Sequence, residues 1–163
     1  MFSELFLHDG LLKALDKLAF EKMTPVQEQA IPLAMEGKDL LVSAETGSGK
    51  TVAFLLPLLH KLLTERAVNS GTRALILTPT RELARQILKH CNDLIGFTNL
   101  KADVITGGAD YKYQAARIRR NPEIIIATPG RILEHIQKNT ADMSDLDVLV
   151  LDEADRMLDM GFS

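Results

Sequence analysis

Short apolar runs alternate with longer segments of helical periodicity along this chain. That rhythm predicts parallel strands joined by crossover helices, which is an α/β fold with a mostly parallel sheet flanked by helices. We expect the strands at residues 39–44, 73–78, 101–106, 123–128 and 147–152. Several polar turns follow these runs, and the carboxyl ends of parallel strands are where such sheets bind ligands.

Helical patterns fill the intervals between the predicted strands. We expect helices at residues 11–20, 25–36, 50–65, 82–95, 111–119 and 131–137. Pro25 suits the first turn of a helix that Thr24 caps. Pro57 lies inside another of these patterns, where a proline ring predicts a kink.

Composition agrees with one globular domain. At 163 residues, 46% hydrophobic and 25% charged, the chain is neither disordered nor membrane-like. Its apolar stretches are too short to cross a bilayer, and its first residues lack a signal-peptide pattern. A single cysteine, Cys91, excludes an internal disulfide and fits a reducing, cytoplasmic location. The net charge of −3 means that nucleic acid must be met by a local basic patch.

A glycine-containing loop stands between the first predicted strand and a helix. It reads Ala44, Glu45, Thr46, Gly47, Ser48, Gly49, Lys50 and Thr51. Small residues there let backbone N–H groups face phosphates, Lys50 brings a positive charge to the terminal phosphates, and Thr51 offers a hydroxyl to Mg²⁺. Ala44 departs from the glycine expected at the first position. Val52 occupies the third glycine position of the competing dinucleotide-binding pattern, which argues against that pattern.

Two acidic residues stand at the end of the last predicted strand. Asp152 ends the apolar run 148–151, which suits a buried parallel strand that delivers an acid to its carboxyl end. Asp152 is the expected second contact to Mg²⁺, and Glu153 would orient or deprotonate the attacking water. Together with Lys50, they predict a site that hydrolyses a nucleoside triphosphate. His8, His60, His90 and His135 lack metal-ligand spacing, so we interpret them as surface or satisfied structural residues.

The order and spacing of the short motifs carry a resemblance. Besides the phosphate loop and the segment 152–155, the chain contains Pro-Thr-Arg-Glu-Leu-Ala at 79–84, Gly-Gly at 107–108 and Thr-Pro-Gly-Arg at 128–131. The chain thereby resembles the first of the two RecA-like lobes of DEAD-box RNA helicases. That resemblance implies contacts to the sugar-phosphate backbone of one RNA strand through Pro79, Thr80, Arg81, Glu82, Gly107, Gly108, Thr128, Pro129, Gly130 and Arg131. Taken singly, each of these has a structural explanation, such as a helix start or a solvated arginine.

The N-terminal region strengthens the resemblance. Residues 19–27 are similar to the family's adenine-reading segment, although Ala19 and Met23 stand where the family usually has glycine and proline. The resemblance implies that Gln27 hydrogen-bonds adenine, Phe2 stacks on it, and Thr24 belongs to the same ATP-binding set, so ATP would be preferred over GTP. Residues 1–37 would form this segment and residues 38–163 the P-loop core. The alternative for the aromatic residues is a role in the core.

The resemblance also implies parts beyond this chain. In the family a second lobe completes the ATP site, and Asp155 links that site to a Ser-Ala-Thr segment. A further strand in the family lies between those that carry the phosphate loop and Asp152, so we expect the chain to be a partial lobe without its later strands.

The favoured hypothesis is a monomeric ATP-dependent RNA helicase, whose isolated fragment is inactive or weak without the second lobe. One alternative is an ATP-responsive RNA clamp with little hydrolysis. Another is a DNA-directed translocase of the same class. Contact with the 2′-hydroxyl would distinguish RNA from DNA.

Overall fold

The predicted strands form one parallel sheet in the computed structural model of the chain, which describes residues 8–17, 41–42, 50–65 and 71–153. The five strands lie in the order β1-β5-β2-β4-β3. Their bounds are Leu41–Val42 for β1, Ala74–Leu77 for β2, Ala102–Ile105 for β3, Ile124–Ala127 for β4 and Val148–Asp152 for β5. Each lies inside its expected range, so the α/β prediction is confirmed.

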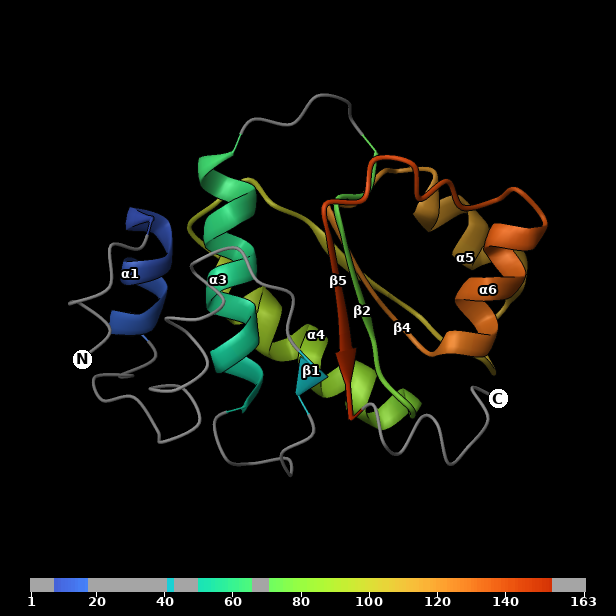
Figure 1. Ribbon diagram of the computed structural model, residues 1–163, viewed down its shortest axis with the longest axis horizontal. Coiled ribbons are helices and arrows are strands. Elements are labelled where there is room, and N and C mark those ends of the chain that lie inside the picture. Colours follow the sequence, from blue (N-terminus) through green and yellow to red (C-terminus); the bar gives the residue numbers. More distant parts are fainter. Residues whose placement is uncertain (1–7, 18–40, 43–49, 66–70, 154–163) are drawn as a thin grey trace.

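Helices cover both faces of this sheet (Figure 1). On one side lie α1 (Asp9–Lys17), α3 (Lys50–Thr64) and α4 (Arg81–Ile95), and on the other α5 (Tyr111–Ile118) and α6 (Pro129–Gln137). The helix α6 begins two residues before the expected Arg131, because proline is well accepted in a first helical turn. The helix α3 continues through Pro57 to Thr64. The helix expected at 25–36 lies outside the described residues.

Alternating side chains of the strands build a core on each face. In β4, Ile124 and Ile126 join the cluster beneath α1, α3 and α4, whereas Ile125 and Ala127 join the cluster beneath α6. All four residues of β4 are buried, as expected for a strand with parallel neighbours and helices on both faces. The sheet is thus fixed from both sides, and its carboxyl edge is a rigid platform.

The strand β1 pairs directly with β5, with Leu41 opposite Leu151 and Val42 opposite Asp152, so no strand of the described residues lies between them. The expectation of a partial lobe stays a prediction. Strand edges carry backbone groups that require hydrogen-bond partners, and these two strands supply them to each other. In addition, Leu149 is 43% exposed and lines an apolar hollow, so the run 148–151 is not buried along its whole length.

No helix within the described residues is long and apolar enough to cross a membrane.

Arg73 ties the sheet to the end of α3. This side chain is only 6% exposed, and its Nε donates to Asp147 Oδ2 at 2.9 Å. Its Nη1 donates to the Leu62 carbonyl at 2.9 Å and its Nη2 to the Glu65 carbonyl at 3.3 Å. These carbonyls belong to the last turn of α3 and to the residue just beyond it, where helical partners run out. One guanidinium therefore anchors the helix that begins at Lys50.

Replacing Arg73 by methionine should lower the free energy of unfolding by about 2–3 kcal/mol, because two backbone carbonyls and one carboxylate lose a charged donor. Chemical denaturation measures the change. The matched control is Arg120→Met at an exposed position, expected to stay within about 0.5 kcal/mol of the unmodified chain. Equal effects of the two substitutions would show that Arg73 is not an anchor.

Candidate functional site

A row of polar side chains crosses the carboxyl edge of the sheet. In sheet order from β3 to β5, its members are Thr106, Thr128, Thr78 and Asp152. The register creates the row, since Leu77 pairs with Ala127 of β4 and with Leu151 of β5. All four members are buried, and the Thr78 hydroxyl donates to Asp152 Oδ2 at 3.4 Å. Turns that are distant in sequence therefore start from neighbouring points.

Asp152 lies at the β5 end of this row, beside the start of the predicted phosphate loop. Its side chain is 1% exposed, and it pairs in register with Val42, the last described residue before the predicted phosphate loop. Lys50 begins α3, so Thr51 lies in the first turn of that helix. A buried carboxylate and a hydroxyl are hard oxygen donors, and burying an ionised carboxylate favours a nearby cation. These residues fit a magnesium ion.

Glu153 follows at once in an unusual backbone conformation. Its φ is 53°, in the left-handed region that residues other than glycine rarely adopt. Such conformations cost energy and gather at functional sites, where they aim a side chain. The chain thus leaves the extended conformation of β5 at Glu153.

Part of the predicted nucleotide site lies outside the described residues. This applies to Phe2, Thr24, Gln27, Glu45, Thr46, Gly47, Ser48, Gly49 and Asp155. Their roles stay predictions, as does the role of the Lys50 side chain, for which only the backbone position at the start of α3 is described.

The predicted RNA-facing turns meet in a single pocket of about 490 Å³. It is lined by Pro79, Thr80, Arg81, Gly107, Thr128, Gly130, Arg131 and Glu134. Seven of these eight residues come from the three turns that the sequence selected, although up to 52 residues separate them along the chain (131 minus 79). The fold therefore brings together most of the set.

The pocket is suited to an anion. The helices α4 and α6 both begin at its wall, and helix N-termini carry unpaired N–H groups and a partial positive charge. Thr80 caps α4, its hydroxyl oxygen accepting from the Leu83 N–H at 3.2 Å, whereas Thr128 makes no capping bond with its side chain. Arg81 and Arg131 add full charges. The chain as a whole is negatively charged, and these groups form the local basic patch that binding of nucleic acid requires.

Glu134 lines the pocket although the sequence analysis did not select it. Its Oε2 lies 3.7 Å from Arg131 Nε, and its Oε1 accepts from Lys138 Nζ at 3.4 Å. Its spacing of three residues from Arg131 on a helix was the available signal. The Glu134 carboxylate therefore helps to hold the charged guanidinium of Arg131 in its position.

Three selected residues are not among those that line the pocket. Glu82 is exposed on α4, and Pro129 lines the apolar hollow of about 350 Å³ between α6 and the sheet. Gly108 has a φ of 83°, and a Cβ added there would meet the guanidinium of Arg81. Gly108 therefore gives Arg81 room to lie across the turn at 107–108.

Three of the four histidines make hydrogen bonds, and the fourth is exposed. His60 Nδ1 accepts from the His8 N–H at 3.0 Å, and burial together with His8 lowers the pKa of His60. His90 is exposed and His135 is fully buried with hydrogen bonds. Within the described residues, no cluster of three or more His, Cys, Asp or Glu side chains could hold a metal ion.

Comparisons with known proteins agree on one family. The model described as DEAD/DEAH box helicase matches residues 24–163. The protein named "Probable ATP-dependent RNA helicase ddx27" of Dictyostelium discoideum is 50% identical over 162 residues, which cover 99% of this chain and 21% of that protein. The ATP-dependent RNA helicase SrmB of Escherichia coli is 48% identical over 163 residues, which cover 99% of this chain and 37% of SrmB.

A solved structure is similar over nearly the same span. The RNA helicase Prp28 from Chaetomium thermophilum, bound to ADP, matches with a TM-score of 0.85 and 42% identity. The match covers 96% of this chain and 39% of that one. The chain thus spans between about a fifth and two-fifths of the length of these three relatives.

Gly108→Ala should lower the free energy of unfolding by about 1–2 kcal/mol, because alanine is strained at this φ and its methyl group displaces Arg81. Gly107→Ala is the matched control, since a Cβ there meets nothing within 4 Å. The control should be neutral or stabilising by up to about 1 kcal/mol. Chemical denaturation distinguishes them, and indistinguishable values would refute the role assigned to Gly108.

Proposed function

Because the chain belongs to the DEAD/DEAH box helicase family, we propose that it is the ATP-binding RecA-like lobe of an ATP-dependent RNA helicase. The hydrogen bond from Thr78 to Asp152 carries this proposal. Asp152 belongs to the predicted nucleotide site, and Thr78 leads directly into Pro79 and the anion pocket. A triphosphate site and a nucleic-acid site therefore adjoin at one sheet edge, as coupling between them requires.

On the nucleotide side, each residue has a distinct task. Lys50 binds the terminal phosphates, while Thr51 and Asp152 hold Mg²⁺. Bound magnesium neutralises charge on the phosphates. Glu153 orients the attacking water and takes its proton, a role that its unusual backbone conformation supports. Glu45, Thr46, Gly47, Ser48 and Gly49 complete the phosphate loop.

Adenine recognition is assigned to the N-terminal segment, residues 1–37, ahead of the P-loop core at 38–163. Gln27 reads the adenine edge, Phe2 stacks on the ring, and Thr24 belongs to the same ATP-binding set. The match to an ADP-bound RNA helicase supports an adenine nucleotide as the ligand. Asp155 couples this site to a second lobe, which completes it in a cytoplasmic, monomeric parent protein.

On the nucleic-acid side, the pocket binds the phosphates of one RNA strand. Arg81 and Arg131 supply charge, the two helix N-termini supply N–H donors, and the turns at 107–108 and 128–131 approach the backbone closely. Such contacts hold a strand without reading its bases. ATP-driven closure of two lobes on one strand would then separate a short duplex locally.

Glu153→Gln should retain ATP binding and lower kcat for hydrolysis by about 10²–10⁴-fold in the two-lobed protein, because the amide cannot accept the proton of water. Lys50→Ala is the reference for lost binding, and equilibrium binding of a fluorescent ATP analogue separates the two variants. Hydrolysis by Glu153→Gln at the unmodified rate would show that another group is the base.

RNA should stimulate the ATPase of the two-lobed protein more than DNA of identical sequence, because only RNA offers the 2′-hydroxyl. Phosphate release at saturating ATP measures this. Equal stimulation by the two strands would contradict the RNA assignment in favour of a DNA translocase. ATP-dependent RNA binding without turnover would instead identify a clamp.

A further inference from the structure

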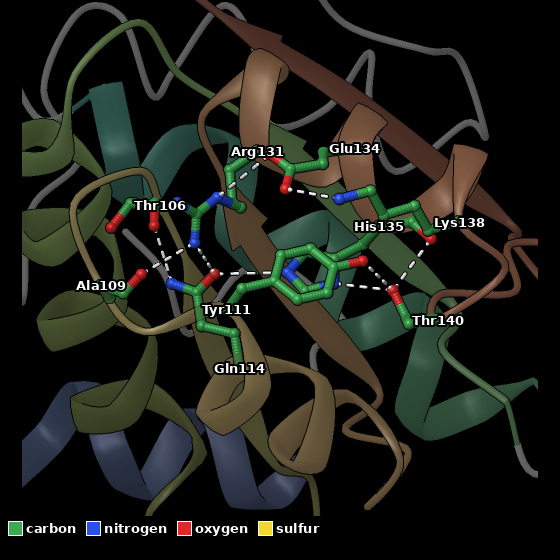
Figure 2. A network of polar contacts seen from close by, with 9 residues as sticks. All are labelled: Thr106, Ala109, Tyr111, Gln114, Arg131, Glu134, His135, Lys138 and Thr140. Atoms are coloured by element: carbon green, nitrogen blue, oxygen red, sulfur yellow. Dashed lines mark hydrogen bonds and ion pairs between the residues drawn. The ribbon is translucent and has the colours of Figure 1, made fainter.

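Two buried polar side chains lie between the turns that form the anion pocket (Figure 2). Gln114 on α5 is 2% exposed, and His135 on α6 is fully buried. Both occupy positions that the helical period assigns to the core, next to Ile118 and Ile132 respectively. Buried polar groups are costly unless they are hydrogen-bonded, so their partners indicate what they stabilise.

Gln114 joins both turns with one amide. Its Nε2 donates to the Thr106 carbonyl at 2.7 Å, and its Oε1 accepts from Arg131 Nη1 at 3.0 Å. The same Arg131 nitrogen donates to the Ala109 carbonyl at 2.9 Å. Thr106 immediately precedes Gly107, and both Gly107 and Arg131 line the pocket. Gln114 therefore fixes the turn at 107–108 relative to Arg131.

His135 supports this amide from behind. Because the Thr106 carbonyl and Arg131 together require Gln114 Oε1 to be the acceptor, His135 Nε2, at 3.3 Å, must carry the proton. Thr140 Oγ1 lies 2.8 Å from His135 Nδ1 and 2.9 Å from Tyr111 OH, and its hydroxyl donates to the His135 carbonyl at 3.0 Å. A neutral imidazole with its single proton on Nε2 satisfies the contact with Gln114.

Burial and charge favour that neutral form. Burial lowers the pKa of His135 below 6.5, and the positive charges of Arg131 and Lys138 lower it further. Glu134 opposes this shift, and the Tyr111 ring stacks on the imidazole with 4.1 Å between the ring centroids. The same two cations also face the Tyr111 ring: Lys138 Nζ lies 4.9 Å and Arg131 Cζ 5.8 Å from its centroid.

We propose that Gln114 is a positioning residue for RNA, which holds the turn at 107–108 and the Arg131 guanidinium in the arrangement that binds a phosphate. This inference rests on the proposed function of the pocket. Gln114 is too buried to touch RNA, so it acts only through its two partners. His135 and Thr140 keep its amide in the required orientation.

Gln114→Met in the complete two-lobed protein tests the proposal, since methionine keeps the volume and removes every hydrogen bond. The RNA concentration that half-saturates ATPase stimulation should rise about tenfold, the change typical of losing a hydrogen bond to a charged group. The KM for ATP and kcat at saturating RNA should stay unchanged, because the side-chain hydrogen bonds of Gln114 go to Thr106, Arg131 and His135 and to none of the described residues of the nucleotide side. Gln137→Met, the same change at an exposed position of α6, should leave all three values unchanged.

Several outcomes would overturn the positioning role. One is a half-saturating RNA concentration within about twofold of the unmodified value in a variant that melts normally. Another is a parallel loss of kcat or of ATP affinity, which would indicate a general structural defect. If RNA does not stimulate the ATPase of the unmodified protein, the proposed function fails. If RNA stimulates the unmodified protein and the Gln114→Met variant equally, only the positioning role of Gln114 is refuted.

Thr140→Val provides a second test if Gln114→Met does not fold. Valine removes the hydroxyl that contacts both His135 Nδ1 and the His135 carbonyl, so the imidazole loses this support and holds the Gln114 amide less firmly. The half-saturating RNA concentration should rise roughly two- to threefold with an unchanged KM for ATP. An unchanged RNA response in this folded variant would contradict the network.

Discussion

The shared register of β2, β4 and β5 is the constraint on which the site depends. Leu77 faces Ala127 on one side and Leu151 on the other, so the strands end together and the next residues lie in a transverse row. If one of these strands slipped by one residue, the polar residue at its end would point to the other face of the sheet. Core clusters on both faces oppose such a slip. The platform is therefore specified by packing, and the chemistry is built upon it.

The carboxyl edge of the sheet combines a part that suits a cation with a part that suits an anion. At β5 a buried carboxylate suits a cation, while the starts of α4 and α6 with Arg81 and Arg131 suit an anion. Thr78 stands between them, since its hydroxyl contacts Asp152 and its chain continues into the pocket wall. The cation-suited and the anion-suited parts of the edge thus meet at one strand end.

The polar network behind the pocket shows a different use of burial. Gln114 and His135 occupy space that apolar side chains could fill, at a desolvation cost that their hydrogen bonds offset. Directional bonds then fix an amide, an imidazole tautomer and a guanidinium relative to two turns. Apolar packing alone would hold the helices together without aiming Arg131.

The sequence by itself determined the pattern of the described strands and helices and the turns at 79–82, 107–108 and 128–131. Those signals are local, since β4, for example, is a continuous apolar run. The tertiary structure alone decided that Thr78 meets Asp152, 74 residues away, and that Gln114 joins two turns. It also paired β1 with β5, and it exposed Leu149 in a run that was expected to be buried. Periodicity shows which face a residue occupies, whereas its partner depends on strand order and register, which no local pattern encodes.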